Sequence, residues 1–191
     1  SRVGGIESLV TNLALSIGNN HKVKVFADQH LVAQDEIFDS ENKNILTIYR
    51  YSGIKFFRHR KKARDIKFFI ENNKVDGIIS DTWKSLELCI DSINSKNIPT
   101  ICLAHGNELI YNNDSRKKRI SYTFNKIKNI VANSRYTSEL LRKIGLDEKK
   151  IYVINPGVKD IRRIKIEKTF NFSGKPILLT LARLDKRKGH L

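Results

Sequence analysis

The sequence predicts an α/β fold built on a doubly wound, mostly parallel sheet. Apolar or β-branched runs of roughly five to seven residues alternate with helical patterns of roughly ten to fifteen, as in successive βαβ units. Residues 101–104 are apolar at every position, which is typical of a strand covered on both faces. The 191 residues suffice for one domain with a full core, or for one domain and part of a second.

The first predicted element is an amphipathic helix over residues 6–18. Apolar residues recur in it at helical spacing and Gly18 supplies a stop, so we expect a buried helix. Gly4 and Gly5 come directly before it, and we expect a further strand of the sheet before Gly4. The chain starts without Met and stops where a helix begins, so we expect both ends to be cut.

The remaining segments differ in how clearly they are patterned. Residues 28–44 show no clear period and are predicted to be loop. Residues 83–93 carry apolar side chains three and four positions apart and are predicted to be one helix. The other predicted elements are, in order, strands 22–27 and 45–51, a helix around 63–70, strands 75–80 and 98–104, a basic helix 116–128, strand 129–133, helix 136–144, and strands 150–154 and 176–182.

Composition excludes several classes of protein. With 40% hydrophobic residues, ten Gly and three Pro, the chain is typical of globular rather than disordered or collagen-like proteins. Its longest apolar runs, such as 177–182, are far too short to span a bilayer, so we expect no transmembrane helix. Cys89 and Cys102 have no metal or redox spacing and are predicted to be buried thiols in a reducing, cytoplasmic compartment.

Candidate ligand-binding residues follow the predicted strands. Ligands of doubly wound sheets bind beyond the carboxyl ends of the strands, which we call the carboxyl edge. Each residue found there is also a common turn or cap residue, so only their combination points to a site. In chain order these residues are Gly4, Gly5, Asp81, His105, Gly106, Asn133, Ser134, Asn155, Pro156, Gly157 and Arg183.

Two segments of the chain suit phosphate groups. Gly4 and Gly5 open a helix, where a ligand can approach free backbone N–H groups, although a tight strand-to-helix turn explains the two glycines better when they are taken alone. Arg183 and Lys188 bracket a strand-to-helix turn, which suits a diphosphate, with a solvated basic tail as the alternative. Because no metal-ligand, nucleophile-elbow or Walker A pattern occurs, we expect neither a metal nor a permanently bound cofactor.

Five motifs together resemble the glycosyltransferase family 4 enzymes, which are retaining sugar transferases of the GT-B fold. The motifs occur in the family's order and at roughly its spacing, and they cover the chain from end to end. They are GGIES at 4–8, HGNE at 105–108, VANSRYT at 131–137, VINPGV at 153–158 and LARLDKRKGH at 181–190.

The resemblance implies two Rossmann-like domains with the active site in the cleft between them. Residues 1–158 would form the acceptor-side domain and residues 159–175 an interdomain linker. Residues 176–191 would form the first strand and turn of a donor domain. We therefore expect no turnover from this stretch alone.

The resemblance also implies roles for single residues. His105 is the expected catalytic residue and would touch the donor sugar, without acting as a general base. Gly4 and above all Gly5 would approach the diphosphate of a UDP- or GDP-sugar. Arg183 and Lys188 would grip that diphosphate, so that no metal is needed. On the acceptor side we expect Glu7, Asn107 and Asn133.

The net charge of +16 is unevenly placed along the chain. Six cations crowd into residues 55–64, which we call the basic segment, beside Phe56 and Phe57. Such a segment favours an anionic membrane surface; the alternative is a solvated helix face with both Phe side chains in the core. The six cations are Lys55, Arg58, Arg60, Lys61, Lys62 and Arg64.

Nucleic acid is the rival partner, because a non-enzymatic basic Rossmann-like module would also carry this charge. The cations are not interleaved with a stacking platform or a groove-reading helix, which disfavours that alternative. The sequence therefore predicts transfer of a sugar from a nucleotide-sugar to a glycan or lipid-linked acceptor. We expect it in bacterial lipopolysaccharide or cell-envelope synthesis, in the cytoplasm or peripherally on the inner face of the plasma membrane. Donor sugar, linkage and oligomeric state stay open.

Overall fold

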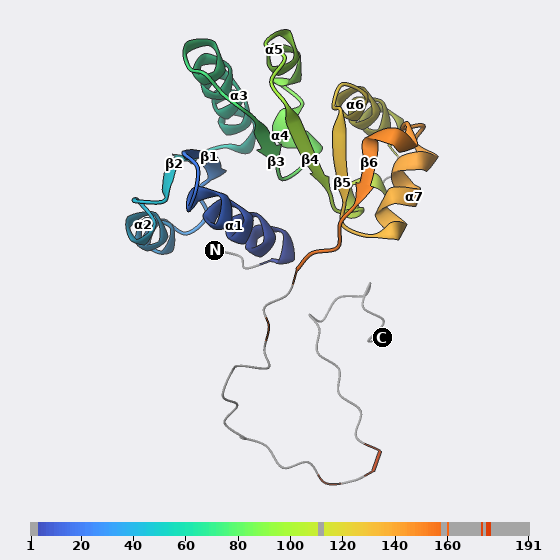
Figure 1. Cartoon of the computed structure of the whole chain (residues 1–191), viewed down its shortest axis with the longest axis horizontal. Helices are drawn as coiled ribbons and strands as arrows, with labels where there is room; N and C mark the ends of the chain where they lie inside the picture. The colour runs from blue at the N-terminus through green and yellow to red at the C-terminus, as the bar shows by residue number, and fades with distance from the viewer. Residues whose placement is uncertain (1–3, 111–112, 158–159, 161–172, 174, 177–191) are drawn as a thin grey trace. The chain divides into compact units, whose positions relative to one another are not determined.

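The computed structural model describes residues 4–110, 113–157, 160, 173, 175 and 176 (Figure 1). The chain divides into two units, residues 1–157 and residues 158–191. All helices and strands described below belong to the first unit. Apart from Pro176, the predicted strand 176–182 lies outside the described residues, as does most of the predicted linker.

Helices and strands alternate through the first unit, as the sequence predicts. The α-helices and 3-10 helices (η) are α1 (Gly5–Gly18), α2 (Val32–Glu41), α3 (Lys55–Asn72), α4 (Trp83–Leu86), α5 (Ile90–Ser95), η1 (Asn107–Leu109), α6 (Asp114–Asn125), α7 (Arg135–Lys143) and η2 (Glu148–Lys150). The strands are β1 (Val23–Asp28), β2 (Leu46–Tyr51), β3 (Ile78–Ser80), β4 (Thr100–Ala104), β5 (Asn129–Ala132) and β6 (Ile151–Val153).

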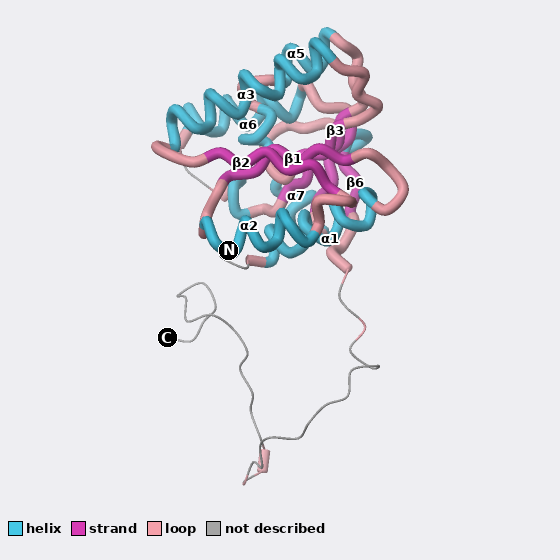
Figure 2. Tube along the Cα trace, turned by 90° about the vertical axis from the view of Figure 1, so that its left-hand side faces the viewer, coloured by secondary structure: helices cyan, strands magenta, loops and turns pink. Residues whose placement is uncertain are grey.

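Every strand pair among the described residues is parallel, which confirms the predicted sheet type. β1 pairs with β2, and a second sheet has the order β3-β4-β5-β6. Figure 2 shows α3, α5 and α6 on one side of the strands and α1, α2 and α7 on the other. The strands are therefore covered on both faces.

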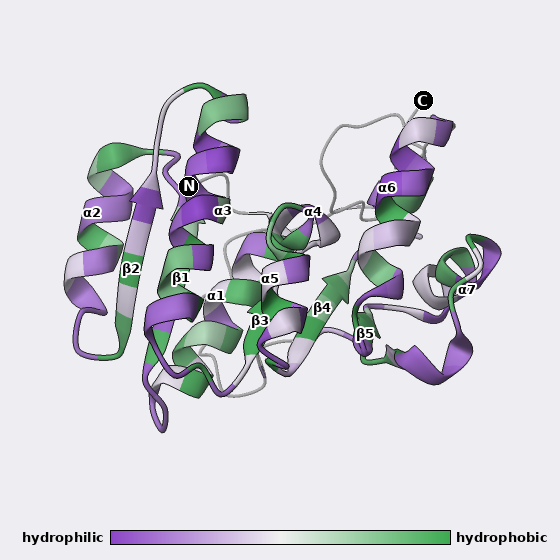
Figure 3. Ribbon diagram, turned by 90° about the horizontal axis from the view of Figure 1, so that it is seen from above, coloured by the Kyte–Doolittle hydropathy of each residue, from purple (hydrophilic) through white to green (hydrophobic). Residues whose placement is uncertain are grey.

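The core lies around the four-stranded sheet. Cys102 and Ala104 of β4 are fully buried, as are Ile90 of α5 and Phe124 of α6. Figure 3 shows the strands β3 and β4 as apolar ribbons between more polar helices. Both cysteines are free and buried, which confirms their predicted state.

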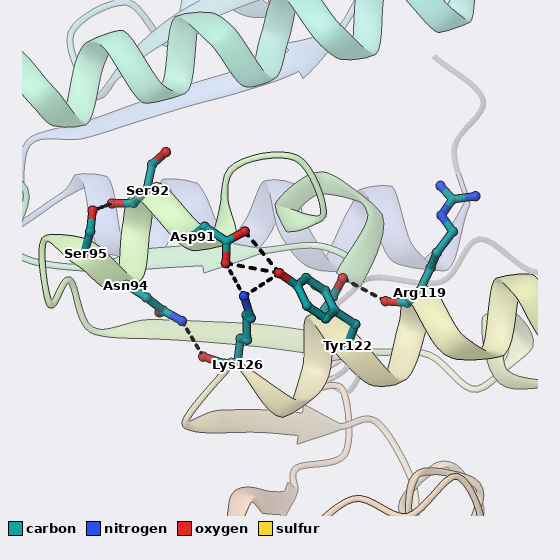
Figure 4. Close-up of polar contacts among 8 residues, drawn as sticks. Asp91, Ser92, Asn94, Ser95, Arg119, Tyr122 and Lys126 are labelled. Atoms are coloured by element: carbon teal, nitrogen blue, oxygen red, sulfur yellow. Dashed lines mark hydrogen bonds and ion pairs between the residues drawn. The ribbon is translucent and has the colours of Figure 1, made fainter.

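Polar contacts tie α5 to α6 at the edge of this core (Figure 4). Asp91 of α5 accepts a hydrogen bond of 3.2 Å from the hydroxyl of Tyr122 and forms an ion pair with Lys126. The side-chain amide of Asn94 donates to the backbone oxygen of Lys126 over 2.9 Å. Lys126 thus binds α5 through its side chain and its backbone, and its charge is paired with Asp91.

The prediction of a buried first helix is wrong, because no residue of α1 is buried. Its apolar side chains Val10 and Leu13 line a cavity of about 2130 Å³, which β1 and β3 also line. β1 and β3 are not hydrogen-bonded to each other, so two sheet edges face this cavity. The strand expected before Gly4 falls on residues that the structure does not describe.

The prediction of a loop over residues 28–44 is also wrong, because α2 lies within it. The carboxylate of Asp35 accepts hydrogen bonds from the backbone N–H groups of His30 and Leu31, over 2.8 and 3.2 Å. Arg50 of β2 pairs with Asp35 at 3.6 Å and with Asp39 at 2.6 Å. Charged contacts with a neighbouring strand hold this helix, and such contacts leave no apolar period in the sequence.

The helix predicted over residues 83–93 is in fact two helices, α4 and α5. A turn separates them, closed by a hydrogen bond of 2.8 Å from the backbone N–H of Cys89 to the oxygen of Leu86. The apolar stripe is nevertheless buried, as its spacing predicts, because Trp83 and Ile93 at its two ends are 2% and 0% exposed.

Candidate functional site

His105 directly follows β4, at the carboxyl edge of the four-stranded sheet. Its Nε2 atom lies 2.8 Å from the backbone oxygen of Asp81, the residue that follows β3. Its backbone N–H donates to the carboxylate of Glu108 over 2.8 Å. Two neighbouring segments of the carboxyl edge therefore fix both the ring and the backbone of His105.

The loop after His105 lies against the start of α7. Gly106 has φ +85°, and a Cβ atom built on it would lie 2.8 Å from Oγ1 of Thr137. The side chain of Ser134 caps α7 by accepting from the backbone N–H of Thr137. Only glycine allows this backbone conformation together with this close approach.

Asn133 follows β5 and is held by both neighbouring segments. Its backbone N–H donates to the oxygen of Ala104 over 3.1 Å, and its side-chain oxygen accepts from the hydroxyl of Thr137 over 2.7 Å. The predicted acceptor-side residues Asn133 and Asn107 thus lie on two adjacent loops, Asn107 in the 3-10 turn η1 after His105.

Gly4 and Gly5 open α1, as predicted. Gly4 is the N-cap residue, and its oxygen accepts the first helical hydrogen bond from Ser8 over 3.0 Å. A Cβ atom on Gly5 would meet nothing within 4 Å, whereas one on Gly4 would collide with the carboxylate of Glu7. The backbone of Gly5 is therefore open to a ligand, and Glu7 covers Gly4.

The structure brings only some of these residues together. Glu7 and Asp81 line the same large cavity, which places the first turn of α1 and the end of β3 on shared walls. Arg183 and Lys188, the predicted diphosphate pair, lie outside the described residues.

The basic segment lies at the start of α3. Phe56 and Phe57 are 56% and 66% exposed, so the alternative with both rings in the core is wrong. Arg58 and Lys62 turn inward and pair with Asp28 of β1, at 3.2 and 2.8 Å. The remaining four cations of the segment, Lys55, Arg60, Lys61 and Arg64, are exposed.

Asp81 was predicted to lie at the carboxyl edge, but no role was predicted for it. Its contribution is a backbone oxygen, which no side-chain motif reveals. Thr137 was likewise missed, although it lies within the quoted motif at 131–137 and its hydroxyl orients Asn133. Within the part of the chain that the structure describes, no cluster of three His, Cys, Asp or Glu residues could hold a metal ion.

Comparison with known proteins decides the family. Residues 3–162 match the sequence model of Glycosyltransferase Family 4. The chain belongs to glycosyltransferase family 4. The resemblance drawn from the five motifs is thereby confirmed. A search of curated proteins found no match.

Solved structures of glycosyltransferases share the fold of this family 4 chain. Anabaena Alr3699/HepE, in complex with UDP and glucose, matches with 15% identity and a TM-score of 0.58, over 81% of this chain and 41% of its own. Arabidopsis thaliana UGT89C1, complexed with UDP-L-rhamnose, matches with 12% identity and a TM-score of 0.55, over 78% and 47%. These neighbours are GT-B glycosyltransferases, and the chain spans less than half the length of each.

Proposed function

We propose that this family 4 chain is the acceptor-side part of a retaining, metal-independent glycosyltransferase. The whole enzyme transfers a sugar from a UDP- or GDP-sugar to a glycan or lipid-linked acceptor. The observation that carries the proposal is the fixed position of His105 at the carboxyl edge, between the loops after β3 and β5.

The contact of His105 with Asp81 defines what the ring can offer a sugar. A carbonyl oxygen only accepts hydrogen bonds, so Nε2 carries the proton in the 2.8 Å contact. In the neutral ring, Nδ1 is then left as an acceptor. It can receive a hydrogen bond from a hydroxyl of the donor sugar and thereby hold the sugar during transfer.

The donor diphosphate is assigned to Gly5, Arg183 and Lys188. The open backbone of Gly5 at the start of α1 supports this assignment, because helix N-termini favour phosphate groups. Two cations supply the charge that stabilises the departing nucleotide without a metal. The UDP bound in the HepE and UGT89C1 structures supports a nucleotide-sugar donor.

The acceptor is assigned to Glu7, Asn107 and Asn133 as its polar contacts. Exposed Phe56 and Phe57, beside exposed cations of the basic segment, support work on the inner face of a membrane. Among the described residues, no helix is both long enough and apolar enough to cross a bilayer.

The test is a sugar-transfer assay on the longest natural form of the protein, with the 191-residue chain beside it. Radiolabelled UDP- and GDP-sugars are offered in the presence of a metal chelator, and NMR of the product reads its anomeric configuration. We expect transfer with retention that the chelator does not reduce. Arg183→Ala and Lys188→Ala should weaken donor binding, and an unchanged donor affinity would remove their role.

A further inference from the structure

A second group of cations lies outside the basic pair assigned to the donor. Lys55 begins α3, Lys84 lies in α4, and Arg119 lies in α6. All three line the large cavity. Three helices that follow three different strands thus bring positive charge to one wall.

These cations repel one another. Burial lowers the pKa of Lys84, and the charges of Lys55, Arg119 and Arg116 lower it further. The carboxylate of Glu87 opposes this shift. Lys55, Arg119 and Arg116 therefore lie close enough to Lys84 for their charges to add to the effect of burial.

Glu87 neutralises only one cation of the group, because its carboxylate pairs with Arg119. The guanidinium of Arg119 binds both carboxylate oxygens of Glu87, with Nη2 at 2.7 Å from Oε2. Among the residues that the structure describes, neither Lys55 nor Lys84 forms an ion pair. Their charges remain available for a ligand.

Arg119 is held in place before any ligand arrives. Its guanidinium lies 5.7 Å from the ring of Trp83, which is 2% exposed, and Glu87 fixes its other side. A guanidinium fixed on a rigid ring loses little freedom when it binds an anion. Arg119 is therefore more ordered than a solvated surface lysine.

His59 supplies an independent sign that a polar ligand belongs here. It lines the same cavity, and its Nε2 atom is buried without a hydrogen-bond partner among the described residues. Buried polar atoms normally have a partner, and one without it calls for a missing donor or acceptor. Burial, then the charges of Lys62 and Lys84, lower the pKa of His59, which places its ring near these cations.

We propose that Lys55, Lys84 and Arg119, with His59, form a binding site for the phosphate group of a phosphate-bearing acceptor. A phosphate has the charge and the several acceptor oxygens that such a set of donors needs. The acceptor is the source that fits, because the donor diphosphate is assigned to Gly5 and the pair after β6. This assignment rests on the proposed function, whereas the anion site itself does not.

The test is the binding of inorganic pyrophosphate to the chain, which is measured by calorimetry at two salt concentrations. We expect Lys84→Gln to weaken binding about tenfold and to reduce its salt dependence. Lys118→Gln is the matched control, because Lys118 is an exposed lysine of the same helix as Arg119 and does not line the cavity. Lys55→Gln provides a second variant whose effect does not depend on α4.

Vesicles then separate the two sources of phosphate. Phosphatidylcholine vesicles are compared with and without phosphatidic acid, for the unchanged chain and for Lys84→Gln. If Lys84→Gln weakens binding to the acidic vesicles as much as to pyrophosphate, the phosphate is that of a lipid-linked acceptor; loss of pyrophosphate binding alone indicates a soluble one. Equal effects of Lys84→Gln and Lys118→Gln, or no pyrophosphate binding, would overturn the site. Because the binding measurement needs no turnover, it can contradict the anion site without contradicting the proposed transferase function, and the transferase assay can do the reverse.

Discussion

The Nε2 atom of His105 lies 2.8 Å from the backbone oxygen of Asp81, a residue 24 positions earlier in the chain. The contact joins the ends of β3 and β4 and sets which ring nitrogen carries the proton. Because Asp81 contributes only its backbone, substitution of its side chain leaves the acceptor in place. The orientation of His105 is thus a property of the sheet rather than of a side-chain pair.

Replacing His105 with Ala should reduce sugar transfer by the longest natural form of the protein. Loss of one hydrogen bond to the reacting sugar costs about 1–3 kcal/mol, or roughly fivefold to 150-fold in rate. His21→Ala is the control, because His21 is an exposed histidine between α1 and β1, near the opposite edge of the sheet. Equal rates for both variants would contradict the assigned role. The measurement is kcat and KM for the nucleotide-sugar.

Gly106→Ala should destabilise the fold more than Gly145→Ala does. Both glycines have positive φ, +85° and +83°, so both variants lose about 1–2 kcal/mol from the backbone. Only the new methyl group on Gly106 meets Thr137, whereas that on Gly145 meets nothing within 4 Å. Overpacking adds about 1–3 kcal/mol. Urea unfolding of the two variants measures the difference, and equal midpoints would show that the contact with Thr137 relaxes freely.

Asp28→Asn should lower stability at neutral pH and have little effect in acid. Burial raises the pKa of Asp28, but the hydrogen bond and charge of Lys62 and the charge of Arg58 lower it by more. A carboxyl group whose pKa is lowered by folding stabilises the folded chain at pH values above its unfolded pKa of about 3.9. This stabilisation is lost as the pH falls through the pKa of the folded state. We expect a cost of about 1 kcal/mol at pH 7.

The measurement for Asp28→Asn is thermal unfolding from pH 7 to pH 3. The difference between the unchanged chain and the variant should shrink across this range. Asp76→Asn is the control, because the Asp76 side chain is 89% exposed and the side chain of Lys74, with which it pairs, is 93% exposed. A difference that is constant with pH would show that packing, and not charge, carries the effect.

Cys89 and Cys102 should resist thiol reagents in the folded chain. Burial raises the pKa of Cys89 to about 11 and also raises that of Cys102. At pH 8 only about one Cys89 in a thousand would be thiolate, and neither sulfur is reached by solvent. Labelling with Ellman's reagent should therefore require denaturant. Rapid labelling of either thiol without denaturant would contradict the burial of β4 and of the turn before α5.

Phe57→Ser should weaken binding to anionic vesicles. Phe57 is 66% exposed beside the cations of the basic segment. Phe68→Ser is a close control, because Phe68 is 67% exposed on the same helix but lies beyond the basic segment. Co-sedimentation with phosphatidylglycerol vesicles measures both. We expect a loss of about fivefold to thirtyfold for Phe57→Ser alone, in line with about 1–2 kcal/mol for one buried ring.

The apolar periodicity of the sequence predicted most of the helices and strands. The strands before Asp81, His105 and Asn133 were predicted within a few residues, because an apolar run is a local property. The period failed at α2, where Arg50 binds two carboxylates of the helix from another strand. It failed again at Cys89, where no Gly or Pro marks the turn between α4 and α5.

The carboxyl-edge residues could be named from the sequence, but not their contacts. His105 was found because it follows an apolar strand and opens a recognisable motif. Its ring partner, Asp81, could not be assigned, since a backbone oxygen has no residue type. The grouping of Lys84 with Arg119 could not be predicted for a related reason, because neither belongs to a motif and their positions in the chain are 35 apart.

The sequence by itself determined the family, the parallel α/β fold and the residues that follow each strand. These properties depend on local spacing and on short motifs. Only the tertiary structure decided which of the 36 cations matter together. It pairs Arg58 and Lys62 with Asp28, commits Lys126 to Asp91, and leaves Lys55, Lys84 and Arg119 on one cavity wall. Charge acts through space over several ångströms, so its effect depends on neighbours that only folding supplies.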